Sequence, residues 1–381
     1  MNRLVIIGNG FDIAHGLKTS YKNFINWYWD KRLDGFAGNT TKVSEDCLCK
    51  LTILDDTYVS CWNVFAFQNS YFKDIFGRRK YSGFEVILEM HKHPETFRLE
   101  FSDFLMTILD SIETKGWVDI EEDYYHLLKK CTEKPTFRAD AKNLNEQLSY
   151  LQEKLIEYLC SIEIPESKGD INRDLADNIC VEDLSIAGKV LAKEMGQIEF
   201  DTNSFDENRY REEHFSGITP ERTMLLCFNY TATAKLYGQD YGYIVNYIHG
   251  ELEHPENIIF GYGDELDKKY QGILEKNDNE LLNKIKSIKY LESKRYHQML
   301  DFLMAAPFQV LILGHSCGNS DRTLLNTIFE HENCVSIKPF YHKWDDGSDN
   351  YLELVQNISR NFTNMRLFRD RVVNKEQCKT M

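Results

Sequence analysis

The stretch that decides the fold stands at the start of the chain: Leu4-Val5-Ile6-Ile7-Gly8-Asn9-Gly10-Phe11-Asp12. Its four aliphatic residues run without polar alternation, which is typical of a strand covered on both faces. Two glycines flank Asn9 in a tight turn, and a helix is expected directly behind it. The chain therefore opens with a buried strand, a glycine turn (Gly8–Gly10) and a helix that carries Asp12 near its start.

Comparable strand signals return only late in the chain. We expect strands over residues 224–228, 243–248, 258–260, 309–313, 335–341 and 365–368. Residues 85–131 and 141–162 instead carry apolar residues at spacings of three and four, which is typical of helices. The pattern predicts an α/β fold with a Rossmann-like, open, mostly parallel sheet interrupted by a large α-helical insertion. We expect residues 1–30 and 214–381 to form one discontinuous α/β domain, and residues 31–213 to form the mostly helical insertion.

The composition limits the classes of partner. The chain has 381 residues, of which 42% are hydrophobic, and a formal net charge of −15. Nucleic acid is not expected as a partner, because phosphate backbones demand clustered Lys and Arg. The longest apolar stretch, about Phe302 to Gly314, is interrupted by Pro307 and is shorter than the roughly 20 residues of a membrane span. No long apolar region typical of a secretion signal opens the chain, so we expect a cytoplasmic protein with no membrane partner.

The ten cysteines predict no disulfide framework. They are scattered, no CxxC pair occurs, and free thiols are expected in a reducing compartment. A zinc site at Cys47, Cys49 and Cys61 is an alternative that the spacing leaves open, but we expect no metal.

Small polar residues follow four of the predicted strands directly. They are the glycine turn, Asn229-Tyr230-Thr231, His249-Gly250, and the segment from His315-Ser316 to Asp321. The carboxyl ends of strands in an open α/β sheet meet at one edge, where ligands bind. We therefore expect these residues to lie together. Each also has a structural interpretation, because Asn229 and Asp321 can cap helices and His249 can be an ordinary loop histidine.

The glycine turn by itself does not predict a dinucleotide-dependent dehydrogenase. The usual fingerprint has a third glycine where this chain has Ile13, and an acidic residue after a second strand about 20 residues on. That later region is helical and aromatic here. The turn is equally consistent with a strand–turn–helix connection that holds no ligand.

The residues from Leu4 to Leu17 resemble the signature of the AbiH family, bacterial abortive-infection proteins that act against bacteriophage. Further segments fit the same family: residues 19–24, residues 117–121, Phe228 to Thr231, His249-Gly250 with Phe260-Gly261, and Gly314 to Ser316 with Asp321. The ordered set is similar, more distantly, to sirtuin-like NAD-consuming domains of antiphage systems. Those domains often carry Asp where this chain has Thr231.

The resemblance implies an antiphage effector whose sirtuin-like α/β domain binds NAD or a related nucleotide. The expected reaction is hydrolysis of the nicotinamide–ribose bond, with no metal. His249 is expected to be the general base, since an imidazole titrates near neutral pH, and Asn229 to orient the water or the ribose. Gly8, Asn9, Gly10 and Phe11 are expected to hold the phosphates and ribose. Asp12, Ser316 and Asp321 are expected to bind sugar hydroxyls.

A wider set of residues is expected around the pocket: His15, Tyr230, Thr231, Gly250, Glu121 and His315. Two of them have structural alternatives. Glu121 lies in an acidic first turn that the helix dipole favours, and His15 can be a packed histidine. The alternative function is a nucleotide sensor without catalysis that recruits a partner through the helical insertion. A homo-oligomer or a partner protein of the defence system is expected in either case.

Overall fold

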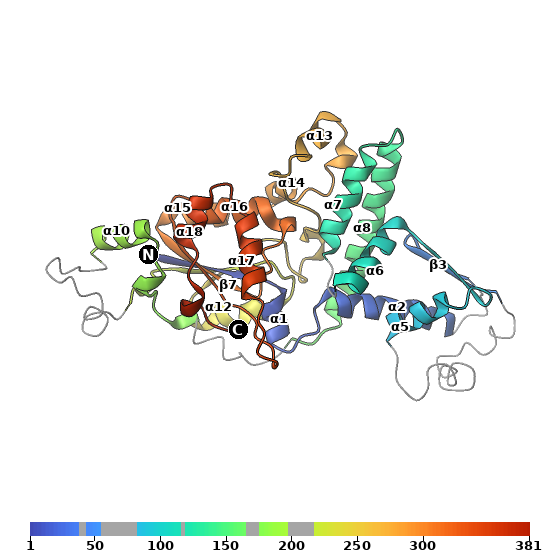
Figure 1. Ribbon diagram of the computed structural model, residues 1–381, viewed down its shortest axis with the longest axis horizontal. Helices are drawn as coiled ribbons and strands as arrows, with labels where there is room; N and C mark the ends of the chain where they lie inside the picture. Colours follow the sequence, from blue (N-terminus) through green and yellow to red (C-terminus); the bar gives the residue numbers. More distant parts are fainter. Residues whose placement is uncertain (38–42, 55–81, 116–118, 165–174, 197–216) are drawn as a thin grey trace. The chain divides into compact units, whose positions relative to one another are not determined.

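The computed structural model describes residues 1–37, 43–54, 82–115, 119–164, 175–196 and 217–381 (Figure 1). The chain forms two compact units. Unit 1 comprises residues 1–17, 162–272 and 284–381, and unit 2 comprises residues 18–161 and 273–283. Both units are discontinuous in sequence, and residues 273–283 return to unit 2 from within the C-terminal half of the chain. No helix in the described ranges is long and apolar enough to cross a membrane.

Unit 1 is built on a five-stranded sheet in which every neighbouring pair is parallel. Its strands are β1 (Asn2–Ile7), β5 (Thr223–Cys227), β6 (Ile244–Tyr247), β7 (Phe308–Leu313) and β8 (Cys334–Pro339). The spatial order is β6-β5-β1-β7-β8. The predicted α/β class with an open parallel sheet is thereby confirmed.

The uninterrupted aliphatic pattern of β1 is explained by cover on both faces. Successive side chains of a strand point to opposite faces. Leu4 and Ile6 belong to one apolar cluster, which includes residues of α15 (Arg295–Ala305), α16 (Arg322–Phe329) and α17 (Tyr351–Arg360). Val5 and Ile7 belong to the other, with Phe11 of α1 (Asn9–Ala14) and Tyr237 of α12 (Lys235–Tyr241). Unit 1 also contains α10 (Ile186–Glu194), α14 (Lys286–Lys289) and α18 (Met365–Arg371), while α13 (Tyr270–Glu275) runs across the unit boundary.

The strand order creates a switch point beside β1. The chain passes from β1 to β5 and β6 on one side, and later to β7 and β8 on the other side. Crevices outside the carboxyl ends of the strands at such a point are the usual ligand sites of open α/β sheets. The glycine turn follows β1 and Gly314 follows β7, so these two segments flank the switch point.

Two expected strands of unit 1 are absent from the described structure. Residues 258–260 have no regular secondary structure. Residues 365–368 are helical and belong to α18. The side chain of Asn364 caps this helix by accepting a hydrogen bond from the Arg366 amide, and Phe368 packs against the core. A short apolar run does not distinguish a strand from a helix, and here the Asn364 cap favours the helix.

Unit 2 is mostly helical. In the described ranges its helices are α2 (Tyr21–Ala37), α5 (Gly83–His91), α6 (Asp103–Lys115), α7 (Ile120–Cys131) and α8 (Phe137–Cys160). A small antiparallel sheet of β2 (Val43–Glu45), β3 (Cys49–Ile53) and β4 (Phe97–Phe101) accompanies them. The helical interpretation of residues 97–101 was therefore wrong. These strands have three to five residues, too few to establish a period of two against a helical background.

The returning segment is held inside unit 2 by side-chain hydrogen bonds. It contains the short helix η5 (Asn279–Leu281). The side-chain amide of Asn145 donates to the carbonyl oxygen of Glu280 over 2.8 Å. The hydroxyl of Tyr124 in turn donates to Asn145 over 2.7 Å. Asn145 of α8 thus links α7 to the returning segment, although the two are more than 140 residues apart in the sequence.

Candidate functional site

The glycine turn is in backbone contact with the segment after β7. The Gly10 amide donates a hydrogen bond of 2.8 Å to the carbonyl oxygen of Gly314. A Cβ atom on Gly10 would lie 2.8 Å from the Cα atom of Gly314. Gly314 itself has a φ of +66°, and a Cβ there would lie 2.1 Å from the Phe11 nitrogen. Glycine is required at both positions by this close approach of two strand ends, whether or not a phosphate binds.

The end of β5 is tied to the same turn. Asn229 is buried, and its side-chain amide donates a hydrogen bond of 2.9 Å to the carbonyl oxygen of Gly8. Thr231 is buried as well and donates to the Oδ2 atom of Asp12 over 2.6 Å. The other carboxylate oxygen of Asp12 has no hydrogen-bond partner in the described structure. Burial raises the pKa of Asp12, against the lowering effect of the Thr231 hydrogen bond.

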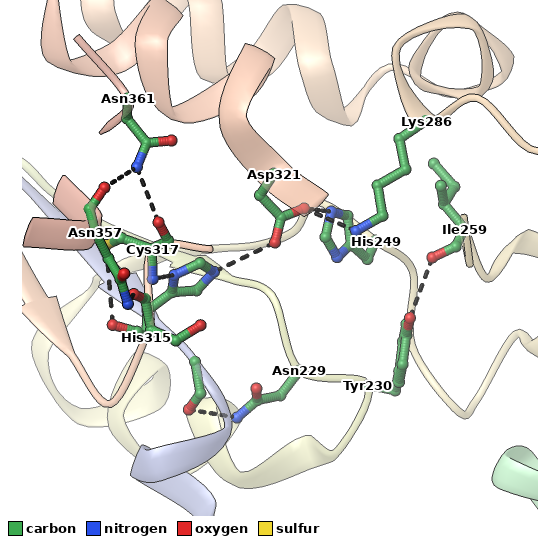
Figure 2. Close-up of polar contacts among 12 residues, drawn as sticks. Asn229, Tyr230, His249, Ile259, Lys286, His315, Cys317, Asp321, Asn357 and Asn361 are labelled. Atoms are coloured by element: carbon green, nitrogen blue, oxygen red, sulfur yellow. Dashed lines mark hydrogen bonds and ion pairs between the residues drawn. The ribbon is translucent and has the colours of Figure 1, made fainter. Parts of the chain in front are cut away.

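A second group of predicted residues surrounds Asp321, the last residue of the short helix η7 (Asn319–Asp321). Figure 2 shows the carboxylate of Asp321 between His315 on one side and His249 with Lys286 on the other. The Oδ1 atom lies 3.3 Å from Nε2 of His249 and 2.8 Å from Nζ of Lys286. The Oδ2 atom lies 3.6 Å from Nε2 of His315. All four side chains are buried.

The charges of this group are strongly coupled. Burial would raise the pKa of Asp321, but the Lys286 ammonium and the two imidazoles hold it well below its usual range. Burial and the Lys286 ammonium lower the pKa of His249, and Asp321 opposes them only in part. The arrangement therefore consists of an ionised carboxylate, an ammonium and a neutral His249 ring.

The two histidines are not equivalent, because their second ring nitrogens differ. The Nδ1 atom of His315 accepts a hydrogen bond of 2.9 Å from the Cys317 amide, so its proton must sit on Nε2, toward Asp321. His249 directs Nε2 at Asp321 and at the Tyr290 hydroxyl, which is 3.0 Å away. Among the described residues, none hydrogen-bonds to Nδ1 of His249. Of these two histidines, only His249 therefore has a ring nitrogen with no hydrogen-bond partner among the described residues.

Aromatic rings complete the surroundings of His249. The Phe228 ring meets both imidazoles edge to face, with centroid distances of 5.1 Å to His249 and 4.3 Å to His315. Tyr290, in the short helix η6 (Tyr290–Glu292), lies parallel to the His249 ring. These rings lower the local dielectric around the His249–Asp321 pair, which strengthens its electrostatic interactions.

The remaining predicted residues make contacts outside the Asp12 and Asp321 groups. His15 contacts the Phe11 carbonyl oxygen through Nδ1 and the Tyr237 hydroxyl through Nε2, at 2.7 and 2.6 Å. The hydroxyl of Tyr230 donates to the Ile259 carbonyl oxygen over 3.1 Å. Gly250 has a φ of +90°, and a Cβ there would meet Asn257. Ser316 is exposed, and its carbonyl oxygen accepts a hydrogen bond from the side-chain amide of Asn357.

The predicted pocket residue Glu121 and the described part of the alternative zinc site both belong to unit 2. Glu121 is buried in the first turn of α7, which Asp119 caps through the Glu121 and Glu122 amides. In the described ranges, no group of three or more His, Cys, Asp or Glu side chains is placed to hold a metal ion. Cys61, the third member of the zinc alternative, lies outside the described residues, as does Trp117 of the family resemblance.

Lys286 and Tyr290 are the members of the site that sequence reasoning missed. Both come from a charged stretch with several similar lysines and tyrosines, and no motif marks them. Their place beside Asp321 and His249 depends on how the chain returns to the sheet edge.

Comparisons with known proteins address the family of the chain. No curated protein matches it. No solved structure matches it. A family model described as "Bacteriophage abortive infection AbiH" matches residues 4–342. This range contains the glycine turn, Asn229, His249 and the Asp321 group. The protein therefore belongs to the AbiH family of bacteriophage abortive infection proteins.

Proposed function

We propose that this AbiH protein is an antiphage effector that hydrolyses the nicotinamide–ribose bond of NAD or a related nucleotide. The observation that carries the proposal is the His249–Asp321 pair, with its nitrogen and oxygen 3.3 Å apart. His249 follows β6 and Asp321 follows β7, and all five parallel strands have their carboxyl ends at the same edge of the sheet, where ligands usually bind. A base held by a carboxylate is the arrangement that general-base catalysis requires.

The reaction needs a base more than an acid. The bond between C1′ of the ribose and the pyridinium nitrogen breaks, and its electron pair leaves with nicotinamide as a neutral ring. A ribose cation resembling an oxocarbenium ion forms in the transition state, as in glycoside hydrolysis. Water adds to C1′, and Nδ1 of His249 takes the proton that the water loses. ADP-ribose, nicotinamide and one proton are the products.

The contacts of Asp321 and Asn229 refine their proposed roles. Both carboxylate oxygens of Asp321 already face basic groups, so we assign it to positioning His249 and not to sugar hydroxyls. Asp12, whose Oδ1 atom has no hydrogen-bond partner in the described structure, remains the proposed acceptor for a sugar hydroxyl. The side-chain amide of Asn229 is committed to Gly8, which leaves its oxygen to orient water or ribose.

The direct test compares purified wild type with His249→Ala by chromatography of NAD after incubation. A general base contributes about 10²- to 10⁴-fold in rate, so the variant should release nicotinamide at least about 100-fold more slowly. His254→Ala is the matched control, because His254 is an exposed histidine five residues further on. The same three proteins are expressed in cells, and NAD is measured before and after phage infection. Equal NAD loss with wild type and His249→Ala would refute the assignment.

One observation favours a second function, a nucleotide sensor without turnover. The polar groups at the strand ends are largely satisfied by one another, as in the Gly10–Gly314 and Asn229–Gly8 hydrogen bonds. Such a site can bind a nucleotide tightly without presenting a reactive water. Calorimetry with NAD and with ADP-ribose, followed by chromatography of the recovered ligand, separates the two functions. Binding without nicotinamide release supports the sensor.

A further inference from the structure

We propose that Lys286 is a positioning residue of the site: its ammonium fixes the Asp321 carboxylate and, through it, the ring of His249. The inference rests on the proposed function for its catalytic meaning, but its geometry stands by itself. Lys286 Nζ lies 2.8 Å from Oδ1 of Asp321, the same oxygen that His249 Nε2 approaches at 3.3 Å. One carboxylate oxygen thus joins the lysine to the proposed base (Figure 2).

Backbone hydrogen bonds hold Lys286 beside Asp321. The Lys286 amide donates to the Tyr262 carbonyl oxygen over 2.9 Å, and the Tyr262 amide donates to Lys284 over 3.0 Å. The next residue, Gly263, donates to the carbonyl oxygen of Ser320 over 3.0 Å. Residues 262 and 263 therefore link the backbone of Lys286 to the residue before Asp321. The link fixes the separation of the two charged side chains.

Gly263 leaves room for that separation. A Cβ atom on Gly263 would lie 3.3 Å from the Cβ atom of Lys286 and 3.3 Å from the Ser320 carbonyl oxygen. Those distances are tighter than ordinary van der Waals contacts. A side chain at this position would press against the Lys286 side chain and against the backbone of the residue before Asp321.

Stability alone does not explain a lysine at this position. Lys286 is 1% exposed, and burying an ammonium is costly unless it is paired. A buried ion pair contributes little net stability compared with apolar residues of the same size. The positive charge of Lys286 instead keeps the buried carboxyl group of Asp321 ionised. An ionised Asp321 can accept a hydrogen bond from the Nε2 proton of His249, which leaves Nδ1 of the neutral ring unprotonated.

Four charged or titratable groups face His249 in the described structure. Asp321 comes from η7, Lys286 from α14, His315 from the segment after β7, and Tyr290 from η6. Lys286 is the one permanent positive charge among them. Its removal leaves His249 beside an uncompensated carboxylate, which favours the imidazolium form.

The first measurement needs no turnover. Histidine titrations are followed by NMR in full-length wild type, Lys286→Met and Lys289→Met. In Lys286→Met, His249 should take up its proton about one to three pH units higher than in wild type. Lys289→Met removes an equal charge one turn away, where Lys289 pairs with Glu292 at the surface, and should leave the titration unchanged. An unchanged titration in folded Lys286→Met would overturn the proposal.

Wild type alone supplies a second test if Lys286→Met does not fold. The ¹⁵N shifts of His249 should show the tautomer with its proton on Nε2, and the ¹³Cγ shift of Asp321 should stay that of a carboxylate below pH 4. A proton on Nδ1, or an Asp321 that titrates normally, contradicts the proposed role.

The kinetic test then connects the role to the reaction. In Lys286→Met, kcat for nicotinamide release should fall at least about tenfold at pH 6.5, its acidic limb should move upward with the titration, and KM should change little. Lys286→Arg, which keeps the charge, should recover part of kcat. Unchanged kcat with a shifted titration would refute Lys286 as a positioning residue for catalysis. If wild type releases no nicotinamide while the titration shifts, the proposed hydrolysis fails and the electrostatic link stands.

Discussion

The side-chain amide of Asn229 donates a hydrogen bond of 2.9 Å to the carbonyl oxygen of Gly8. This contact joins residues that are 221 positions apart, and it ties the end of β5 to the turn that follows β1. The two strands are neighbours in the sheet, so the hydrogen bond closes the edge at which both end.

Replacing Asn229 should therefore destabilise the protein as well as inactivate it. In Asn229→Asp the side chain has no amide donor, and its carboxylate faces the Gly8 carbonyl oxygen. We expect a loss of about 1–3 kcal/mol in the free energy of unfolding, measured by urea denaturation at pH 7.5. Asn257→Asp, at an exposed position, is the control and should change stability by less than about 0.5 kcal/mol. Equal stability of both variants would mean that the Asn229 hydrogen bond contributes nothing.

The close approach of the two strand ends predicts a graded effect of alanine at glycines. Gly314→Ala combines a positive φ with a contact of 2.1 Å, and should cost about 2–5 kcal/mol of unfolding free energy. Gly16 has a φ of +80° and nothing within 4 Å, so Gly16→Ala should cost only about 1–2 kcal/mol. Gly272→Ala, in a helix with open space, should be neutral or slightly stabilising. Equal losses of unfolding free energy in Gly314→Ala and Gly16→Ala would show that the backbone around Gly314 can shift to make room for a methyl group.

Asp12 should make the protein less stable as the pH rises. Its folded pKa is raised above the usual value of 3.8, chiefly by burial. Below pH 3.8 the carboxyl is protonated in both states, and its stabilising contribution is complete. That contribution is lost as the pH rises through the folded pKa, because only the unfolded state ionises freely. Each unit of pKa difference is worth about 1.4 kcal/mol at higher pH.

Asp12→Asn is the variant that tests this dependence. An amide does not ionise, and its oxygen can still accept the Thr231 hydrogen bond. We expect a higher melting temperature than wild type at pH 7.5, with weaker binding of the nucleotide. Asp345→Asn, at an exposed carboxylate, should leave the melting temperature unchanged. A lower melting temperature for Asp12→Asn would show that the ionised carboxylate is stabilised in place.

Within unit 2, Asp46 holds several groups at once. Its Oδ1 atom accepts the Leu48 and Cys49 amides at 2.8 Å each, and its Oδ2 atom accepts the hydroxyls of Tyr28 and Tyr150. Asp46→Ala removes the acceptor that these donors share and the carboxylate that pairs with Arg32 at 3.3 Å, and it should cost about 3–5 kcal/mol in chemical denaturation.

Hydrogen exchange locates the effect of Asp46→Ala. The Leu48 and Cys49 amides should exchange much faster in the variant than in wild type, because each loses its acceptor. Glu45→Ala, one residue earlier on an exposed side chain, should leave both rates unchanged. Protection of both amides in Asp46→Ala would contradict the role of Asp46.

The five strands of the sheet in unit 1 could be predicted from the sequence because they are buried on both faces. A run such as Leu4 to Ile7 is compatible with few structures besides a buried strand, and four of the five strands are followed within two residues by Gly, Asn or His. Weaker signals failed where tertiary contacts decide. Phe97 to Phe101 pairs with β3 as a strand although its surroundings are helical, and Met365 to Phe368 is helical because Asn364 caps it.

For the site, the sequence identified the residues directly after the strands and missed those from other parts of the chain. Asn229, His249 and His315 each follow a strand, and their shared edge could be predicted from that position alone. Lys286 follows no strand. Neighbouring Lys284 and Lys289 have the same chemistry, so only the pairing of residues 262 and 285 selects Lys286 for Asp321.

The return of residues 273–283 to unit 2 has a consequence for Lys286. Lys286 stands three residues beyond Asn283, where that segment ends. Three residues of extended chain span at most about 11 Å. The segment that Asn145 holds within unit 2 therefore ends only three residues before the lysine that pairs with Asp321 in unit 1.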